Sequence, residues 1–130
     1  TVLIEGDDMS DPIADQSRSI LDGHIVLSRE LTDFGIYPPV HILNSASRVM
    51  SDIVSPEHLK AIFKFRRLYT ILKENEVLIR IGAYQKGSDP ELDEAINKKS
   101  EMEKFLIQNS TSINPFDDTV EAILKITSTP

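Results

Sequence analysis

The spacing of the apolar residues changes near Ser55, and this change limits the folds that the chain can adopt. Before Ser55, short β-branched runs alternate with short helical patterns. After Ser55, apolar residues recur every three or four positions, which is the spacing of one face of an α-helix. That face is predicted to hold Leu59, Ile62, Phe63, Tyr69 and Leu72. We therefore expect an α/β part over residues 1–52 and an all-α part over residues 53–130.

Two apolar runs in the first part, residues 1–5 and 24–28, are typical of buried strands. Between them, Asp11 can cap a helix that has Pro12 in its first turn, and a second short helix is expected over residues 29–34. A strand, a helix and a strand at this spacing predict a βαβ unit with parallel strands. Two strands alone leave sheet edges unpaired, and the chain does not begin with Met. We therefore expect it to be a piece of a longer protein.

The second part is expected to be a small antiparallel helical bundle. Its first helix begins after Ser55 and is predicted to extend to about Tyr84. Ser88 and Glu91 form a predicted capping box at the start of the next helix, and Asn114-Pro115 begins the last one. The inward positions of these two helices are predicted to be Leu92, Ile96, Met102 and Leu106, followed by Val120, Ile123 and Leu124.

Composition excludes several classes of function. The formal net charge of −7 argues against nucleic acid or an anionic membrane as the main partner. The chain has no cysteine, which excludes disulfides, thiolate nucleophiles and thiolate zinc sites. It also contains no phosphate-binding Gly-x-x-x-x-Gly-Lys-Ser/Thr loop, nucleophile elbow or His-Glu-x-x-His pair. A complete active site is therefore not expected within these 130 residues.

Carboxylates are concentrated near the start of the chain. Glu5, Asp7, Asp8, Asp11 and Asp15 all precede the first basic residue of the sequence. Clustered carboxylates after a strand suit Mg²⁺ binding or general-base chemistry. A solvated loop followed by a helix cap explains the same residues. The sequence leaves both interpretations open.

Two residues of the first part could serve a ligand. Tyr37 precedes Pro38 and Pro39, which restrict the backbone and would hold the ring in one place. Such a ring suits stacking on a nucleobase, but it could also fill space under the sheet edge. Arg48 ends a Ser-rich segment and could stabilise a phosphoryl transition state, or it could pair with a nearby carboxylate.

Basic residues are concentrated in the first predicted helix of the second part. They are interpreted as a solvated helix face rather than as a binding patch. The residues are Lys60, Lys64, Arg66 and Arg67.

A series of motifs resembles the C-terminal part of rotary-type ATPase catalytic subunits. In order, they are Gly-Asp-Asp-Met-Ser-Asp-Pro (6–12), Leu-Asp-Gly-His-Ile-Val-Leu-Ser-Arg (21–29), Gly-Ile-Tyr-Pro-Pro (35–39) and Asn-Ser-Ala-Ser-Arg-Val-Met (44–50). Within that superfamily, Tyr-Gln-Lys-Gly-Ser-Asp-Pro-Glu-Leu-Asp-Glu-Ala-Ile (84–96) is similar to the type III secretion ATPases, and most of all to the flagellar protein-export ATPase.

This resemblance implies a fold and a set of site residues. It implies the end of a RecA-like parallel-sheet ATPase domain followed by a C-terminal helical bundle, in a ring of six subunits with ATP at each interface. Arg48 matches the arginine finger that acts in trans on the neighbouring subunit, and Tyr37 matches the residue that stacks on adenine. A second aromatic normally follows a Phe-Leu-x-Gln stretch. Here Phe105-Leu-Ile-Gln108 precedes Asn-Ser-Thr, so this contact is missing or supplied by Phe105.

The resemblance also implies a function for the parent protein, which is ATP hydrolysis that energises flagellar (type III) protein export. ATP and Mg²⁺ would bind the parent, whereas the fragment alone would bind neither and would be inactive without the phosphate loop. The implied location is the cytoplasm of a bacterium, peripheral to the export gate of the inner membrane.

The partners implied by the resemblance are further copies of the chain in a homo-hexamer, a central coiled-coil stalk, an ATPase regulator, export chaperones and substrates, with no nucleic acid. The stalk is expected to meet Asp7, Asp8, Asp89 and Glu91. The alternatives are an interaction module without catalysis and a subunit of a rotary ATP synthase.

Overall fold

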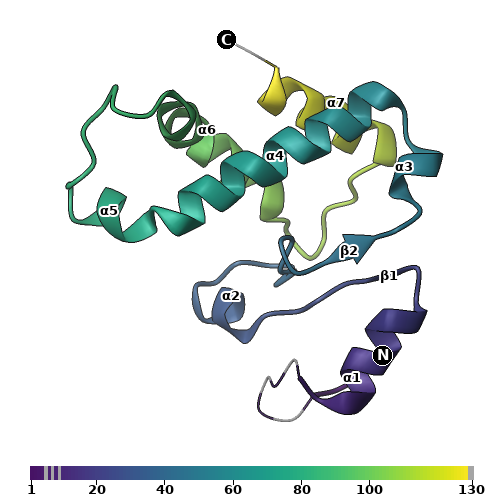
Figure 1. Ribbon diagram of the computed structural model, residues 1–130. Helices are drawn as coiled ribbons and strands as arrows, with labels where there is room; N and C mark the ends of the chain where they lie inside the picture. The colour runs from purple at the N-terminus through teal and green to yellow at the C-terminus, as the bar shows by residue number, and fades with distance from the viewer. Residues whose placement is uncertain (5, 7, 9, 129–130) are drawn as a thin grey trace.

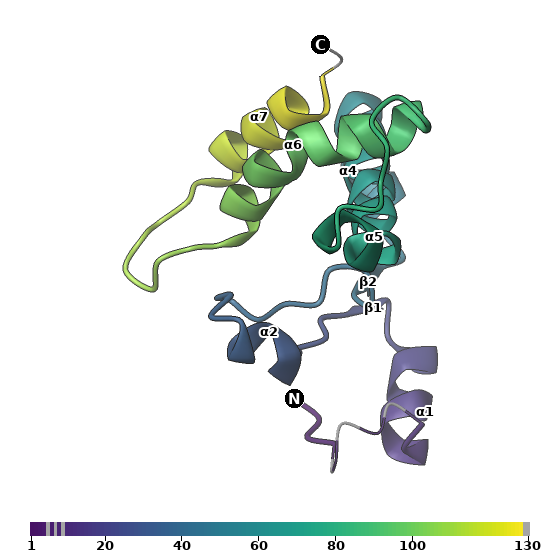
Figure 2. The same ribbon diagram turned by 90° about the vertical axis from the view of Figure 1, so that its left-hand side faces the viewer.

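The computed structural model describes residues 1–4, 6, 8 and 10–128, and these are mostly helical. A three-helix bundle lies above a smaller part that contains a two-stranded sheet and two helices (Figures 1 and 2). In chain order, the elements are α1 (Pro12–Ile20), β1 (Gly23–His24), α2 (Arg29–Asp33), β2 (Ala46–Ser47), α3 (Met50–Ile53), α4 (Pro56–Glu74), α5 (Glu76–Arg80), α6 (Pro90–Leu106) and α7 (Phe116–Thr127).

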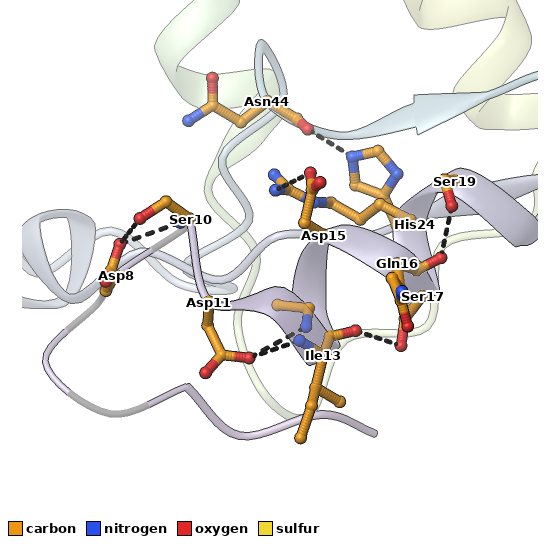
Figure 3. Close-up of polar contacts among 12 residues, drawn as sticks. Asp8, Ser10, Asp11, Ile13, Asp15, Gln16, Ser17, Ser19, His24 and Asn44 are labelled. Carbon is orange, nitrogen blue, oxygen red and sulfur yellow. Dashed lines mark hydrogen bonds and ion pairs between the residues drawn. The ribbon is translucent and has the colours of Figure 1, made fainter.

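Local signals explain the first helix. The carboxylate of Asp11 accepts hydrogen bonds from the backbone N–H groups of Ile13 (2.9 Å) and Ala14 (3.1 Å), so it caps α1 at the predicted position (Figure 3). Pro12 occupies the first turn, where its missing N–H group costs nothing. The prediction of this helix and of its cap is confirmed.

The sheet differs from the prediction. Its strands β1 and β2 are antiparallel, with Gly23 opposite Ser47 and His24 opposite Ala46. Residues 1–4 form no strand, so the expected parallel pairing between the runs 1–5 and 24–28 is not found in the part of the chain that the structure describes.

The antiparallel pairing follows from the turn after α2. The chain reverses there through Gly35, whose φ of +71° is readily adopted only by glycine. It then returns along the first strand, and an isolated bridge between Leu27 and Val40 continues the pairing beyond the two strands. Gly23 allows this close approach, because a Cβ atom there would lie 2.7 Å from the carbonyl oxygen of Ala46.

The hydrophobic core lies between α4, α6 and α7. The side chain of Met102 is fully buried, and Phe65 packs against Phe105 with ring centroids 5.4 Å apart. The buried cluster consists of Ala61, Phe65, Leu68, Leu72, Ala95, Met102, Ile123 and Ile126. The expected helical bundle is therefore present, and α4 is its central helix (Figure 1).

Two inward positions were predicted wrongly. Phe63 is 59% exposed, whereas Phe65 is only 3% exposed. The buried face of α4 contains Ala61 and Phe65, and a residue halfway between them points to the opposite side of a helix. Leu124 is 37% exposed because the buried face of α7 is defined by Ile123 and Ile126.

Charged side chains also join the three helices. Lys64 of α4 lies 2.7 Å from the carboxylate of Glu94 in α6, and Lys98 lies 4.0 Å from the same group. Lys98 also donates to the carbonyls of Ile126 (2.6 Å) and Ser128 (2.7 Å). The last carbonyls of a helix have no partner within the helix, so this lysine completes the C-terminal end of α7.

No helix in the described part of the chain is long and apolar enough to cross a membrane.

Substitution of the two phenylalanines tests the observed face of α4. Phe65→Ala should lower the free energy of unfolding by about 3–5 kcal/mol, because it opens a cavity in the core. Phe63→Ala removes the same atoms from a largely exposed position and should lower it by much less. Urea unfolding followed by circular dichroism measures both values. Equal losses for the two variants would contradict the assignment.

Candidate functional site

Arg48 follows β2 directly and is exposed. Its backbone N–H donates to the carbonyl of Asp22 (2.8 Å), which fixes the start of the side chain. The guanidinium donates to the carbonyls of Ser19 (3.2 Å) and Arg18 (3.3 Å), near the C-terminal end of α1. A helix C-terminus carries partial negative charge, so α1 orients the cation. These contacts are to backbone carbonyls and not to the carboxylate that the sequence left open as an alternative.

A compact turn lies before Arg48. The carbonyl of His41 accepts hydrogen bonds from the backbone N–H groups of Asn44 (3.1 Å) and Ser45 (3.0 Å). The hydroxyl of Ser45 accepts from the backbone N–H of Val26 (3.0 Å). Nε2 of His24 lies 2.9 Å from the carbonyl oxygen of Asn44, as Figure 3 shows. The turn is therefore held against the strand that precedes α2.

Arg66 attaches this turn to the helical bundle. Its Nη1 donates to the carbonyls of Ile42 (2.7 Å) and Ser45 (3.1 Å), and its Nη2 donates to the carbonyl of Leu43 (3.0 Å). The interpretation of Arg66 as part of a solvated face is therefore wrong. No sequence pattern distinguishes it from Arg67, because the two arginines lie four residues after Ile62 and Phe63, and both of these were predicted to face the core.

The other three predicted surface residues of α4 differ in their exposure. Arg67 is exposed and forms a two-pronged pair with the carboxylate of Glu91, at 3.0 and 2.7 Å. The hydrogen bonds and the charge of Glu91 raise the pKa of Arg67 above its usual value. Lys60 is also exposed. The prediction of a solvated face is consistent with the structure for Arg67 and Lys60, whereas Lys64 is half-buried and pairs with Glu94 of α6.

Tyr37 lies at the meeting point of the two parts of the molecule. Its carbonyl accepts a hydrogen bond from the backbone N–H of Gln108 (2.7 Å), at the end of the Phe-Leu-Ile-Gln stretch. The residue is 50% exposed within this chain. A pocket beside it is lined by Tyr37, Pro38, Pro39, Gln108, Asn109, Ser110 and Ser112.

Phe105 does not line the pocket that contains Tyr37. It packs against Phe65 and lines a different cavity of about 320 Å³, together with Ile36 and Met102. The structure therefore gives the ring of Phe105 a place beside the core. The wall of the Tyr37 pocket that comes from the helical part is polar, because residues 108–112 form it.

The acidic candidates lie at opposite ends of the molecule, with Asp8 before α1 and Asp89 before α6 (Figures 1 and 2). Asp7 is outside the described residues. The carboxylate of Asp8 accepts hydrogen bonds from the hydroxyl and the backbone N–H of Ser10 (Figure 3), and these lower the pKa of Asp8.

Asp89, and not Ser88, caps α6. Its carboxylate accepts from the backbone N–H groups of Glu91 (2.9 Å) and Leu92 (3.2 Å). Pro90 is the first helical residue, so the capping position falls one residue later than predicted. The hydroxyl of Ser88 donates instead to the carbonyl of Gln85 (2.7 Å). The carboxylates of both Asp89 and Glu91 therefore have partners within the chain.

The described residues contain no group of three or more His, Cys, Asp or Glu side chains that could hold a metal ion. Within the acidic N-terminal segment, Asp11 caps α1 and Asp15 pairs with Arg18 at 3.1 Å. The helix-cap interpretation explains Asp11, and Glu5 and Asp7 of the same segment lie outside the described residues.

Comparison with known families supplies the context of this site. Residues 1–47 match the nucleotide-binding domain of the ATP synthase alpha/beta family. Residues 54–125, more than half of the chain, match the T3SS EscN ATPase C-terminal domain. The chain belongs to the T3SS EscN ATPase C-terminal domain family.

Proteins of both flagellar and type III secretion systems resemble this EscN-type chain over almost its whole length. The flagellum-specific ATP synthase of Helicobacter pylori strain J99 is 64% identical over 126 residues, which cover 97% of this chain and 29% of the relative. The assembled ATPase EscN from the type III secretion system of enteropathogenic E. coli matches with a TM-score of 0.95 and 44% identity, over 98% of this chain and 31% of that chain.

EscN in complex with its central stalk EscO, from the same bacterium, matches with a TM-score of 0.85 and 43% identity, over 91% of this chain and 29% of that chain. The EscN-type chain described here thus spans less than a third of the length of these proteins.

The corrected cap of α6 can be tested with two neighbouring substitutions. Asp89→Ala should lower the free energy of unfolding by about 1 kcal/mol, because it leaves two N–H groups of the first turn without their acceptor. Ser88→Ala should change it much less, since Ser88 contacts only the preceding loop. Thermal and urea unfolding compare the variants. A larger loss for Ser88→Ala would restore Ser88 as the cap.

Proposed function

We propose that the chain is the C-terminal part of an ATPase that energises flagellar (type III) protein export. In this proposal, residues 1–52 are the end of a RecA-like ATPase domain and residues 53–130 are its C-terminal helical domain. The observation that carries the proposal is the 64% identity to the flagellum-specific ATP synthase of Helicobacter pylori strain J99 over 97% of the chain. The TM-score of 0.95 to assembled EscN supports the fold. The proposal is also supported by the exposure of Arg48 and the half-exposure of Tyr37, the two residues that it assigns to a nucleotide site between subunits.

Arg48 is proposed to act as an arginine finger in trans. Charge builds on the transferring phosphoryl group in the transition state, and a guanidinium can neutralise it through two parallel N–H donors. Arg48 is exposed, and two carbonyls of α1 already orient its guanidinium. A cation that is held in place before the reaction needs little reorganisation when the charge develops.

The first test is Arg48→Ala in the full-length protein. ATP turnover should fall by about 10³-fold or more, while nucleotide affinity stays largely intact. Mixed rings with a phosphate-loop variant should regain part of the activity, because each subunit supplies the group that the other lacks. Steady-state hydrolysis and nucleotide titration measure both quantities. Near-normal turnover by the Arg48→Ala ring would refute the role.

Tyr37 is proposed to stack on the adenine of ATP bound by its own subunit. Tyr37 lines a pocket together with its two prolines and the polar residues Gln108, Asn109, Ser110 and Ser112. In a chain whose Phe105 packs beside the core, this polar segment takes the place of a second aromatic contact. Tyr37 would then supply the larger share of the stacking.

The second test compares two substitutions of Tyr37. Tyr37→Ala should weaken ATP and ADP binding by about 1–3 kcal/mol, the range for stacking of a base on an aromatic ring. Tyr37→Phe should change binding little, because it retains the ring. A titration with a fluorescent nucleotide measures the affinities. A large loss for Tyr37→Phe, or no loss for Tyr37→Ala, would contradict stacking.

The remaining features of the proposal concern assembly. The full-length protein is proposed to form a homo-hexamer that hydrolyses ATP with Mg²⁺, whose ligands and phosphate loop lie on other segments; the fragment alone would be inactive. The relative EscN was solved as an assembled ATPase and with its central stalk EscO, which supports a ring around a stalk.

We further propose that the ring works in the cytoplasm, peripheral to the inner membrane, with an ATPase regulator, export chaperones and substrates as partners. Of the four acidic candidates for stalk binding, Glu91 pairs with the cation Arg67, which partly neutralises its charge. Asp8 and Asp89 accept hydrogen bonds from uncharged groups, so steering of a basic stalk would depend mainly on Asp7, Asp8 and Asp89.

A further inference from the structure

Three backbone carbonyls converge on the guanidinium of Arg66. Those of Ile42 (2.7 Å), Leu43 (3.0 Å) and Ser45 (3.1 Å) all accept from its two terminal nitrogens. They belong to one turn, and Arg66 belongs to the central helix of the bundle. The planar fork of an arginine can satisfy several acceptors at fixed angles, whereas the single ammonium of a lysine cannot reproduce that pattern.

The turn held by Arg66 leads directly into Arg48. Ser45, one of the three acceptor residues, is separated from Arg48 only by the two residues of β2. The contacts of the Arg48 guanidinium itself are longer, at 3.2 and 3.3 Å. The position of Arg48 therefore depends on the backbone that carries it, and Arg66 fixes that backbone relative to α4.

The Arg66 contacts give the segment that carries Arg48 a second connection to α4. Arg48 is joined to α4 on one side through α3 (Met50–Ile53), whose residues are largely exposed. On the other side it is joined to α4 through β2, the turn and Arg66. A short exposed helix alone gives weak control of orientation. With the Arg66 contacts, a movement of α4 is transmitted to the segment that carries Arg48.

We propose that Arg66 is a positioning residue that couples the helical domain to the arginine finger. The inference rests on the proposed role of Arg48 in catalysis. A shift of α4, for example when a partner contacts the bundle, would move the turn and would change the distance between Arg48 and the nucleotide of the neighbouring subunit. Arg66 itself contacts no nucleotide in this proposal.

The experiment uses Arg66→Lys in the full-length protein, with Arg67→Lys as the matched control. Both substitutions keep the charge on the same helix, but Arg67 contacts only Glu91 of α6. Arg66→Lys should lower kcat by about 10²-fold, since a misplacement of about 1 Å can have that effect. KM, nucleotide affinity and ring assembly should stay close to those of the wild type. Arg67→Lys should leave kcat unchanged.

A double variant separates positioning from a general structural role. Arg48→Ala combined with Arg66→Lys should be no slower than Arg48→Ala alone, because a residue that acts through Arg48 has no effect once Arg48 is gone. Mixed rings of Arg66→Lys with a phosphate-loop variant should regain activity, since the intact phosphate loop of one subunit then meets a correctly held Arg48 from the other.

The outcomes distinguish the two proposals. Full turnover by Arg48→Ala would refute the finger itself. If Arg48→Ala is inactive while Arg66→Lys has wild-type kcat, the finger stands and the coupling is wrong. Effects that multiply in the double variant, or a loss of assembly or of nucleotide affinity in Arg66→Lys, would also overturn the coupling.

Discussion

The hydrogen bonds from Arg66 to the turn of residues 42–45 join two parts of very different internal stability. The helical part has a continuous buried core. In the first 52 residues, only Ala14 and Leu31 are buried apolar residues among those that the structure describes. In the proposed full-length protein these residues end a RecA-like domain, so other segments of that domain would complete their core. Within this chain, the N-terminal part is joined to the bundle through Arg66 and through the hydrogen bond between Gln108 and Tyr37.

The charged residues of the two parts make different kinds of contact. Several charged side chains of the bundle join its helices, as Lys98 does at the end of α7 and Arg67 does with Glu91. Arg48 and Tyr37 differ from these, because both are exposed and both are held mainly through their backbones. Exposed groups on a fixed backbone are suited to meeting a ligand or a neighbouring subunit.

The sequence predicted the features that depend on neighbouring residues. The capping of α1 by Asp11 and the end of α2 before Gly35 are fixed within a few positions, so local patterns were sufficient. The antiparallel pairing of residues 23–27 with 40–47 was missed, because it depends on how the chain returns after α2. The face of α4 was misjudged for a similar reason, since the choice between Phe63 and Phe65 is made by α6 and α7.

The candidate site was also predicted only in part from the sequence. Motifs indicated Arg48 and Tyr37, but no motif marks Arg66, whose acceptors lie more than twenty residues earlier in the chain. Every residue has a backbone carbonyl, so the residue types at positions 42, 43 and 45 do not show that they accept hydrogen bonds from an arginine. The capping of α6 was misplaced by one residue because both Ser88 and Asp89 are good capping residues, and Pro90 decided between them.

The most direct measurement is a structure of the full-length ring with ADP and aluminium fluoride, which mimics the transferring phosphoryl group. The account predicts that the guanidinium of Arg48 lies at about 3 Å, a hydrogen-bond distance, from the fluoride group bound by the neighbouring subunit. Arg66 should still contact the carbonyls of residues 42, 43 and 45. The account would be contradicted if the guanidinium of Arg48 lay out of reach of the nucleotide.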